Sequence, residues 1–349
     1  MPGGANSGLA GRILFGHERE DPGWLLDLST GHYRKVAGTD VEYYPGCDDA
    51  RGDDFSVIPN QQGDRFVVTV KDCSYLSDFD WEHLIVVLDE TGNELSRFML
   101  EATSGDVQNA TLSPDGNLIA VLYSDGRYYD EENRILLVDL QGNPVGEPGS
   151  HEVTGPLVEW LPDNRLLYAS GQSLYITEPN STEGRQFVSF DEEEGYPADV
   201  AVSPDGSRVA LSLRAENTYS QYGSPWVIDL DTLEQTKLAH YDDPFQEDGV
   251  GRIEDPTWSP DGEYIALMAG SDRWGITVPA VVTPAPDGPR SDGALLFVVP
   301  ADSRDVLLDE SVEGVRAVRS YYVEADPHTG DGGEFGTDIY FNFGMYWIR

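Results

Sequence analysis

The sequence predicts an all-β protein, a six-bladed β-propeller built from four-stranded antiparallel blades. Three observations support this prediction. The phrase Ser-Pro-Asp-Gly occurs three times, at residues 113–116, 203–206 and 259–262. A short apolar stretch precedes each copy, and a run of alternating strand-forming residues follows it. No stretch carries a helical apolar period over a useful length.

Each Ser-Pro-Asp-Gly phrase has the chemistry of a tight turn between two strands. Proline presets φ at the second position, aspartate bonds to its own backbone, and glycine accepts a positive φ. A degenerate copy at residues 161–164 has asparagine in place of glycine, the next best residue for a left-handed conformation. A weaker copy at residues 58–64 keeps a proline, Pro59, and the flanking strands. Five strand–turn–strand copies indicate a repeat protein.

The repeating unit has four strands. After the turn come a second strand, a variable loop, a third strand ending in aspartate, a Gly/Asn turn and an outer strand. The first unit has strands at residues 55–59, 65–70, 83–89 and 94–100. Four further units cover residues 108–147, 156–190, 199–238 and 256–308, the last with an insertion at 270–293. The prolines at positions 59, 114, 162, 204 and 260 lie 55, 48, 42 and 56 residues apart, a spacing typical of propeller blades.

The two ends of the chain are expected to close the ring. Residues 11–16, 23–28 and 32–36 read as strands without an inner strand of their own. Near the carboxyl end, residues 319–324 suggest another inner strand and residues 339–348 a final aromatic strand. If the carboxy-terminal strands supply the inside of the amino-terminal blade, the blades number six and no open sheet edge remains between first and last. Seven blades are the alternative, because the tail could hold an extra partial blade.

We expect residues 11–349 to form this single domain, preceded by a disordered linker at residues 1–10. The pattern apolar–SPDG–x–x–IA–apolar, followed about 20 residues later by an apolar strand ending in Asp-Leu, resembles the TolB-type, WD-like propeller repeat over residues 54–308. That resemblance implies the fold. It says little about function, because such repeats occur in binding subunits, in lyases and in front of serine-peptidase domains.

The charge balance is strongly acidic. The formal net charge is −41, from 63 acidic and 22 basic residues. Such a field would repel nucleic acid and anionic membrane surfaces, so neither is expected as a partner. No run approaches the ~18 apolar residues of a membrane span, so no membrane insertion is expected. The acidity fits either solubility in a salty environment or attraction of a basic partner or divalent cations, and composition leaves both open.

In such blades, the loops between second and third strands and between blades lie on the face opposite the Ser-Pro-Asp-Gly turns. These longer loops are rich in aromatic residues, which suit stacking on sugars or gripping basic and apolar side chains of a protein partner. The predicted binding residues are Tyr75, Phe79, Trp81, Tyr128, Tyr129, Tyr219, Tyr222 and Trp274. The alternative is that these rings pack the loops on one another.

Cys47 and Cys73 lie in loops that flank the predicted hairpin at residues 55–70. Because the two ends of an antiparallel hairpin lie close together, a disulfide between them is geometrically reasonable. It would imply an oxidising compartment, and we therefore expect a periplasmic or extracellular, cell-surface protein whose leader is absent from this chain. Two unpaired cysteines in a cytosolic protein are the alternative.

Sequence signatures of catalysis are missing or faint. The chain contains no G-x-S-x-G, C-x-x-C or H-E-x-x-H pattern, and its six histidines lack ligand spacing. Asp326, Asp331 and Asp338 combine with several glycines, as a calcium site requires, although without the EF-hand spacing. Calcium is the one cofactor that the sequence suggests.

We therefore predict a non-catalytic binding or scaffolding module, of a bacterial envelope or a secreted complex, that binds a protein partner through its aromatic and acidic loops. The alternative is a propeller enzyme, a polysaccharide lyase or hydrolase, or a carbohydrate-binding protein. The two differ in a visible way: an enzyme needs polar groups that converge at the central pocket, whereas a scaffold needs only an exposed patch.

Overall fold

A computed structural model describes the chain over most of its strands and short turns. The described residues are 9–15, 23–29, 32–36, 55–70, 83–100, 107–125, 132–147, 158–191, 195–214, 223–242, 252–270, 277–278, 295–318, 321–322, 339–340 and 345–349. Within these ranges the structure is all-β. They contain no helix long and apolar enough to cross a membrane.

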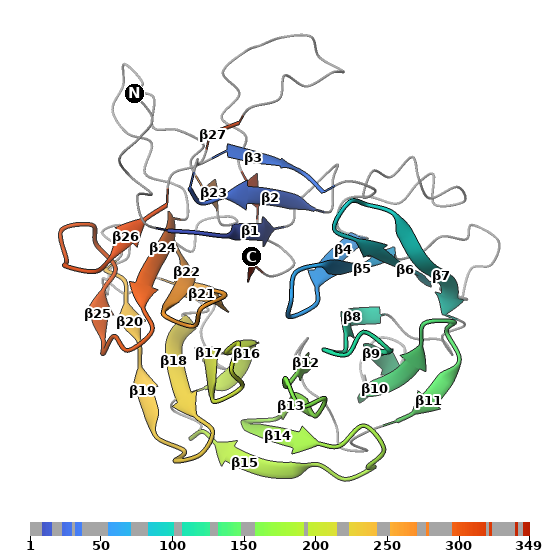
Figure 1. Ribbon diagram of the computed structural model, residues 1–349. Helices are drawn as coiled ribbons and strands as arrows, with labels where there is room; N and C mark the ends of the chain where they lie inside the picture. Colours follow the sequence, from blue (N-terminus) through green and yellow to red (C-terminus); the bar gives the residue numbers. More distant parts are fainter. Residues whose placement is uncertain are drawn as a thin grey trace.

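The sheets form six blades around a central axis, so the six-bladed prediction is confirmed and the seven-bladed alternative is wrong (Figure 1). In blades 1 to 5 the strands pair antiparallel in sequence order, from the axis outward. Blade 1 comprises β4 (Phe55–Pro59), β5 (Arg65–Val70), β6 (His83–Asp89) and β7 (Glu94–Leu100). Blade 2 comprises β8 (Val107–Leu112), β9 (Leu118–Asp125), β10 (Glu132–Asp139) and β11 (Pro144–Gly146). Blade 3 comprises β12 (Val158–Trp160), β13 (Leu166–Ser170), β14 (Ser173–Thr177) and β15 (Arg185–Ser189).

The other three blades complete the ring. Blade 4 comprises β16 (Tyr196–Val202), β17 (Arg208–Arg214), β18 (Gly223–Asp229) and β19 (Gln235–Lys237). Blade 5 comprises β21 (Arg252–Trp258), β22 (Tyr264–Gly270), β24 (Leu295–Pro300) and β26 (Arg316–Ala317). Blade 6 comprises β29 (Met345–Ile348), β1 (Arg12–Phe15), β2 (Trp24–Asp27), β3 (His32–Lys35) and the short β27 (Tyr321–Tyr322). Two small pairs lie outside the blades: β20 (Ala239–His240) with β25 (Val306–Leu307), and β23 (Thr277–Val278) with β28 (Ile339–Tyr340).

The core of the protein lies between the blades. Each of the six junctions between neighbouring blades holds its own cluster of buried apolar side chains. In β5, Phe66 and Val68 pack toward blade 6, whereas Val67 packs toward blade 2. Because successive side chains of a strand point to opposite faces, a strand buried on both faces must be apolar without a break. This explains the runs of apolar residues in the second and third strands.

The Ser-Pro-Asp-Gly turns form as the sequence predicts. Gly116, Gly206 and Gly262 have φ values of 72°, 71° and 73°, and Asn164 takes the same place with φ 65°. In the turn of blade 4, the hydroxyl of Ser203 donates to Asp205 (2.7 Å) and accepts from the backbone N–H at the start of β17 (2.9 Å). The other two Ser-Pro-Asp-Gly turns repeat both bonds.

The first blade departs from the predicted alignment by two residues, because Gln61 and not Pro59 takes the place of the turn proline. Its turn runs from Asn60 to Gly63, where Gly63 has φ 71° and its N–H donates to the carbonyl of Asn60. Pro59 is therefore the last residue of β4 and not the turn proline. The Asn60 side chain replaces the serine hydroxyl, because its Oδ1 accepts from the backbone N–H groups of Asp64 and Arg65 (3.1 and 3.2 Å).

The ring closes through the last strand of the chain, as predicted. β29 is the inner strand of blade 6 and pairs antiparallel with β1, with Trp347 opposite Ile13. The indole N–H of Trp347 donates to the carbonyl of Ala10 (2.9 Å), and its backbone N–H donates to Thr257 Oγ1 of blade 5 (2.9 Å). One residue thus joins the amino-terminal segment, the final strand and the preceding blade.

Several finer predictions about the ends are wrong. The segment expected as an inner strand at residues 319–324 contributes β27, which pairs parallel with β3 at the outer edge of blade 6. The expected strand at 339–348 is two strands with different partners, β28 and β29. Residues 306–307 form β25, which pairs with β20, and the fourth strand of blade 5 is β26. Leu9 is buried in the core, so the packed structure begins within the segment assigned to the linker.

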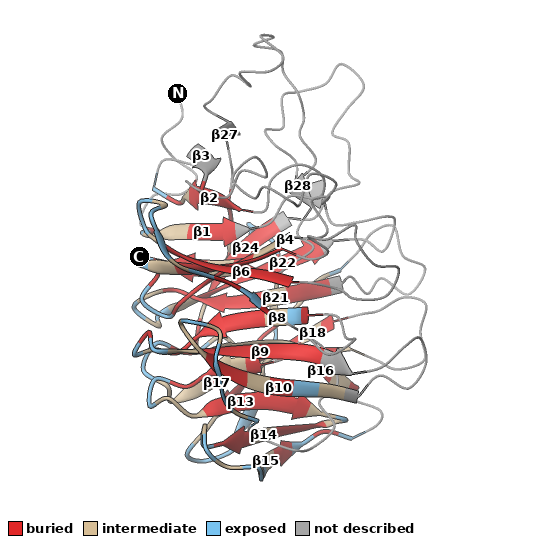
Figure 2. Cartoon of the chain, turned by 90° about the vertical axis from the view of Figure 1, so that its right-hand side faces the viewer, coloured by how far each residue is buried: buried red, intermediate tan, exposed pale blue. Residues whose placement is uncertain are grey.

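The turns that join first to second strands and third to fourth strands lie together on one side of the disc, whereas the short β13–β14 turn at residues 171–172 lies on the other. Strand direction brings the Ser-Pro-Asp-Gly turns and the turns between third and fourth strands to the same face, and Figure 2 shows them along one edge with the carboxyl end. We call this the turn face, and the opposite side the loop face. The inner strands of blades 1 to 5 run from the loop face to the turn face.

Replacing Trp347 with alanine should destabilise the whole ring. Trp347 is 7% exposed and makes both closure bonds, so the substitution removes a large buried side chain and one hydrogen bond. A loss of about 3–5 kcal/mol in the free energy of unfolding is expected from chemical denaturation. The control is Val145→Ala, at a residue that is 56% exposed. A loss for Trp347→Ala no larger than that of the control would contradict this role of the final strand.

Candidate functional site

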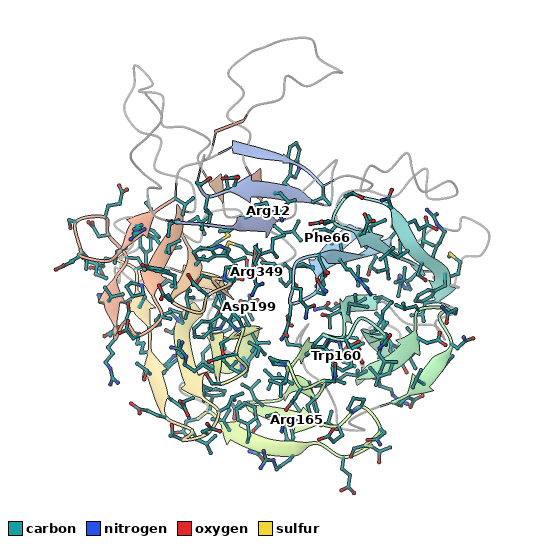
Figure 3. The ribbon with its side chains drawn as sticks, viewed as in Figure 1. Arg12, Phe66, Trp160, Arg165, Asp199 and Arg349 are labelled. Carbon is teal, nitrogen blue, oxygen red and sulfur yellow. The ribbon has the colours of Figure 1, made fainter. Side chains whose placement is uncertain are left out.

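A cavity of about 430 Å³ lies on the axis of the ring. Residues of all six inner strands line it: β4, β8, β12, β16, β21 and β29. Figure 3 shows Asp199 and Arg349 around the opening at the centre of the ring. We call this cavity the channel. Each of these inner strands is paired along one edge with the second strand of its blade.

Three carboxyl groups from three different blades line the channel. Glu159 comes from β12, Asp199 from β16 and Asp255 from β21. Asp199 and Asp255 occupy equivalent positions, each four residues before the serine that opens its turn. Glu159 lies two residues before its turn and thus nearer the turn face. The carboxylates from blades 4 and 5 therefore lie on the loop-face side of the one from blade 3.

Irregular backbone accompanies two of these carboxylates. The pairing of β16 with β17 shifts register between Pro197 and Asp199, and that of β21 with β22 shifts between Glu254 and Thr257. Asp255 has φ 49°, a left-handed conformation that few residues other than glycine adopt. Bulges re-aim side chains and are frequent next to functional sites. Here they place consecutive acidic groups, Glu254 and Asp255, at the junction of blades 4 and 5.

A buried ionic network surrounds Asp199. Burial raises the pKa of Asp199 and the nearby Glu254 carboxylate raises it further, whereas Arg214 and a hydrogen bond from Ser212 Oγ (3.1 Å) oppose the rise. Arg214 pairs with Glu254 at 3.0 Å, and the side chain of Glu254 is only 7% exposed. Burial alone would lower the pKa of Arg214, but the Glu254 and Asp199 carboxylates raise it. The positive charge of Arg214 thus stabilises two carboxylates, those of Glu254 and Asp199.

Glu159 differs from these groups because no ion pair joins it to a basic side chain within the described part of the chain. Burial raises the pKa of Glu159 to about 8, against an opposing hydrogen bond from the backbone N–H of Trp160. At neutral pH the group is therefore mostly a neutral carboxylic acid. The indole of Trp160 donates to the carbonyl of Thr111 in blade 2 (3.0 Å), which fixes the inner strand that carries Glu159.

Tyr346 completes the polar lining from blade 6. Burial raises the pKa of its hydroxyl well above the ordinary value, and the carboxyl groups of Glu159, Asp255 and Asp199 add to the rise. All three acidic groups therefore act on one phenol, which indicates that they share one electrostatic field inside the channel. At neutral pH the phenol keeps its proton and can donate it to an acceptor.

Apart from Arg214, two basic groups of the described residues lie near the channel, at its turn-face rim. Arg349 is exposed and lines the channel at the end of β29. Arg12 donates from Nε and a terminal nitrogen to the main-chain oxygen of Arg349 (2.9 and 2.7 Å). The channel thus has arginines at one mouth and carboxylates farther inside, toward the loop face.

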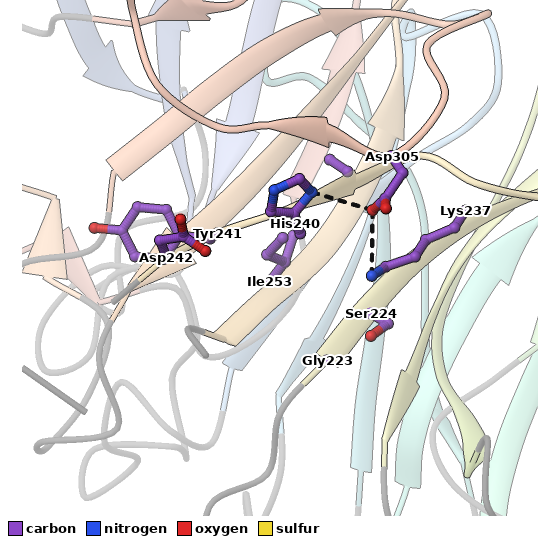
Figure 4. A pocket seen from close by; sticks show the side chains of 9 residues that line it. Gly223, Ser224, Lys237, His240, Tyr241, Asp242, Ile253 and Asp305 are labelled. Carbon is purple, nitrogen blue, oxygen red and sulfur yellow. Dashed lines mark hydrogen bonds and ion pairs between the residues drawn. The ribbon is translucent and has the colours of Figure 1, made fainter. Parts of the chain in front are cut away.

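A second cavity of about 280 Å³ lies between the outer parts of blades 4 and 5 (Figure 4). Its charged groups pair with one another: Asp305 contacts Lys237 Nζ at 3.2 Å and His240 Nδ1 at 3.1 Å. The backbone N–H of Asp305 also donates to the carbonyl of Lys237 (2.8 Å). These bonds attach the segment after β24 to the edge of blade 4, which gives this group of residues a structural role.

The structure leaves the predicted site residues untested. The eight aromatic residues, both cysteines and the three aspartates suggested for calcium lie outside the described residues: Tyr75, Phe79, Trp81, Tyr128, Tyr129, Tyr219, Tyr222, Trp274, Cys47, Cys73, Asp326, Asp331 and Asp338. The predictions for them stand as predictions. Within the described residues, no group of three or more histidine, cysteine or acidic side chains has the geometry of a metal site.

Sequence reasoning missed the channel carboxylates, although a signal for them exists. Glu159, Asp199 and Asp255 each stand in an inner strand, two or four residues before a recognised turn. The two register shifts could not be read from the sequence, because a bulge alters the alternation only by one residue.

No family model matches the sequence, and no curated protein is similar to it. Solved structures are similar in fold. One is TolB from Acinetobacter baumannii (TM-score 0.56, 13% identity, 97% of this chain and 66% of that chain). Another is the GH74 enzyme from Niastella koreensis (TM-score 0.52, 9% identity, 85% of this chain and 45% of that chain). A putative TolB from Agrobacterium tumefaciens is aligned over 97% of this chain and 99% of its own, with TM-score 0.49 and 12% identity.

At these identities the comparisons establish the fold alone. This chain spans just under two thirds of the length of the Acinetobacter protein and less than half of the GH74 enzyme. The similarity to TolB agrees with the repeat resemblance in the sequence. The fold occurs in a TolB protein and in a GH74 enzyme, so function has to be argued from the channel.

Replacing Glu159 with glutamine should stabilise the protein in alkaline solution. Because the folded-state pKa is raised to about 8, the carboxyl costs stability once the unfolded chain ionises above about pH 4.5, and this cost grows up to about pH 8. Glu159→Gln should gain roughly 2 kcal/mol at pH 9 and little at pH 4, a value discounted for partial solvent exposure. Thermal unfolding at both pH values tests this, with Glu147→Gln, at an exposed residue, as control. An equal effect at both pH values would contradict the assignment.

Proposed function

We propose that this protein is a non-catalytic binding module that takes a positively charged segment of a protein partner into its channel from the loop face. The observation that carries the proposal is the set of carboxyl groups of Glu159, Asp199 and Asp255 around one cavity. Each comes from a different blade, so their convergence follows from ring closure and not from one acidic stretch of sequence.

Charge complementarity selects the partner's chemistry. The cavity holds the Asp199 and Asp255 side chains together with the buried Glu254–Arg214 pair beside it, so acidic groups outnumber the single inner arginine. A segment bearing lysine or arginine would gain charge-assisted hydrogen bonds there, whereas an acidic segment would be repelled. The acidic field of the whole chain, −41, would also steer a basic partner toward it.

The arrangement of charges favours one direction of approach. Arg349 and Arg12 lie at the turn face, where they would oppose a basic segment, and the carboxylates lie farther toward the loop face. The loop face is also where the sequence predicts the aromatic residues. A cavity of about 430 Å³ suits one or two side chains rather than a folded domain. We therefore expect the remainder of the partner segment to lie over the loop face.

Peptide binding tests this proposal. A fluorescein-labelled peptide of alternating arginine and glycine should bind the wild type in low salt, and a glutamate–glycine peptide should not. The double variant Asp199→Asn, Asp255→Asn should weaken binding by at least about tenfold, because it removes two ionisable carboxyls without changing side-chain size. The asparagine at 255 also tolerates the left-handed backbone seen there.

The matched control is the double variant Glu90→Gln, Glu147→Gln, which removes two exposed carboxylates away from the channel. Its affinity for the arginine–glycine peptide should stay near that of the wild type. Equal weakening in both double variants would mean that the peptide binds only to the general acidic field, and this would contradict a channel site. Fluorescence anisotropy at two salt concentrations measures all of these affinities.

One observation favours a second function, cleavage of a glycosidic bond. Glu159 keeps a proton at neutral pH, as a general acid must, and further carboxyl groups line the same cavity. A protonated and an ionised carboxyl on either side of a sugar bond are the groups that glycoside hydrolysis uses. An enzyme of this fold needs polar groups that converge at the central pocket, and these carboxyl groups do so.

Polysaccharide turnover separates the second function from the first. Incubation with neutral and acidic polysaccharides, followed by a reducing-end assay, should give product with the wild type and at least about 100-fold less with Glu159→Gln if Glu159 is the acid. Product formation that Glu159→Gln leaves unchanged would exclude Glu159 as the acid. If no polysaccharide is cleaved while the basic peptide binds, the binding function stands alone.

A further inference from the structure

Glu159 occupies a singular position among the inner strands. Counted from the first residue of each turn, its equivalents are Ile58, Thr111, Ala201 and Thr257, none of which ionises near neutral pH. It is therefore the only carboxyl group at that level of blades 1 to 5, one step closer to the turn face than Asp199 and Asp255. Its side chain lines the channel and is partly buried.

The groups that face Glu159 give it no cationic partner. The Glu159 carboxyl group is near enough to the Tyr346 phenol of β29 to act on it, and the acidic groups Asp199 and Asp255 of β16 and β21 line the same cavity. The lining from β4 and β8 is polar or apolar without charge: Ser56, Ile58, Gln108, Asn109 and Thr111. Arg349 at the rim is exposed. A carboxyl group in such surroundings keeps its proton, and burial raises the pKa of Glu159 to about 8.

A cation that enters the channel shifts the protonation equilibrium of Glu159 toward the carboxylate. An ammonium or guanidinium group within hydrogen-bond distance favours the ionised carboxylate, since opposite charges at ~4–6 Å lower a carboxyl pKa by 1–3 units. Ionisation also converts the carboxyl into an acceptor for charge-assisted hydrogen bonds. Binding and proton loss at Glu159 are therefore linked, each favouring the other.

We propose that the channel binds a lysine or arginine side chain of the partner in exchange for the proton of Glu159. The proton passes to the solvent, the carboxylate pairs with the cation, and the net charge of the channel is unchanged by binding. This inference rests on the proposed binding function. It adds a pH dependence: the partner binds more tightly as pH rises, until Glu159 is ionised before binding.

Calorimetry of the arginine–glycine peptide tests the exchange directly. At pH 7 the wild type should release about 0.4 to 0.9 proton per peptide, because Glu159 is about nine-tenths protonated before binding and a pKa lowered by 1–3 units leaves at most about half of it protonated in the complex. The heat of binding in Tris and in phosphate should then differ by that fraction of the difference between the two buffer ionisation enthalpies. At pH 9 the difference should fall close to zero. Between pH 6 and pH 7 the affinity should rise by up to about tenfold.

The variant Glu159→Gln should still bind the peptide but release no proton, with an affinity that does not change from pH 6 to pH 9. Equal heats in the two buffers for a wild type that binds would overturn the exchange and leave the binding function intact. Proton release that persists in Glu159→Gln would assign it to another group and overturn the inference. Absence of peptide binding by the wild type would overturn both proposals.

A measurement without ligand keeps the inference testable if the variant is unstable. Infrared spectroscopy of the wild type through a titration from pH 6 to pH 10 should show loss of a protonated-carboxyl stretch near pH 8. All exposed carboxyl groups ionise at much lower pH, and the same titration of Asp199→Asn separates Glu159 from the other carboxyl group whose pKa burial raises. Complete ionisation of carboxyl groups by pH 6 would overturn the exchange, whatever the peptide does.

Discussion

The pairing of the last strand with the first is the interaction on which the rest of the structure depends. Every blade has a neighbouring blade on both sides only because β29 pairs with β1. Trp347 adds hydrogen bonds to Ala10 and to Thr257. Each of the six apolar clusters lies between two blades. Opening the ring at blade 6 would therefore expose the apolar clusters that blade 6 shares with blades 1 and 5. Closure of the ring gives each of the six sheets an apolar cluster on both of its faces.

Ring closure also explains where function can reside. The side chains of each blade sheet are used to pack against the neighbours on both sides, as Phe66 and Val67 illustrate. Side chains of the inner strands that face the axis do not pack against a neighbouring blade. They come from all six blades and line one cavity. Acidic groups are costly in such a place, so Asp199 needs Arg214 and Ser212, and Glu159 stays protonated. Groups that destabilise the fold at a shared cavity are good candidates for functional ones.

The sequence was sufficient for the fold and insufficient for the site, for physical reasons. Turn chemistry is local, so Ser-Pro-Asp-Gly predicts each hairpin, and repetition predicts the blades. Pairings without a local signal were misjudged: β27 joins β3, and β25 joins β20. The two-residue error at Pro59 arose because Asn60 replaces the serine of the turn, with its side-chain oxygen as the acceptor. The channel carboxylates are far apart in sequence, and only the closed ring brings Glu159 and Asp255 to one phenol.

The acidic residues of this chain include two groups with different roles, the aspartates of the turns and the carboxyl groups of the channel. Asp89, Asp139 and Asp229 end third strands and accept hydrogen bonds within their own turns, which lower the pKa of each. Such carboxylates stabilise the folded state above the unfolded pKa, and the contribution is lost as the pH falls through the lowered value. Glu159 has the opposite sign, because its raised pKa costs stability as the pH rises toward 8. The turn aspartates are thus explained by the fold that they help to build. Burial of the channel carboxyl groups costs folding free energy, because burial disfavours their charged forms. A cationic partner would offset this cost, and this is the physical reason to look for function on the axis.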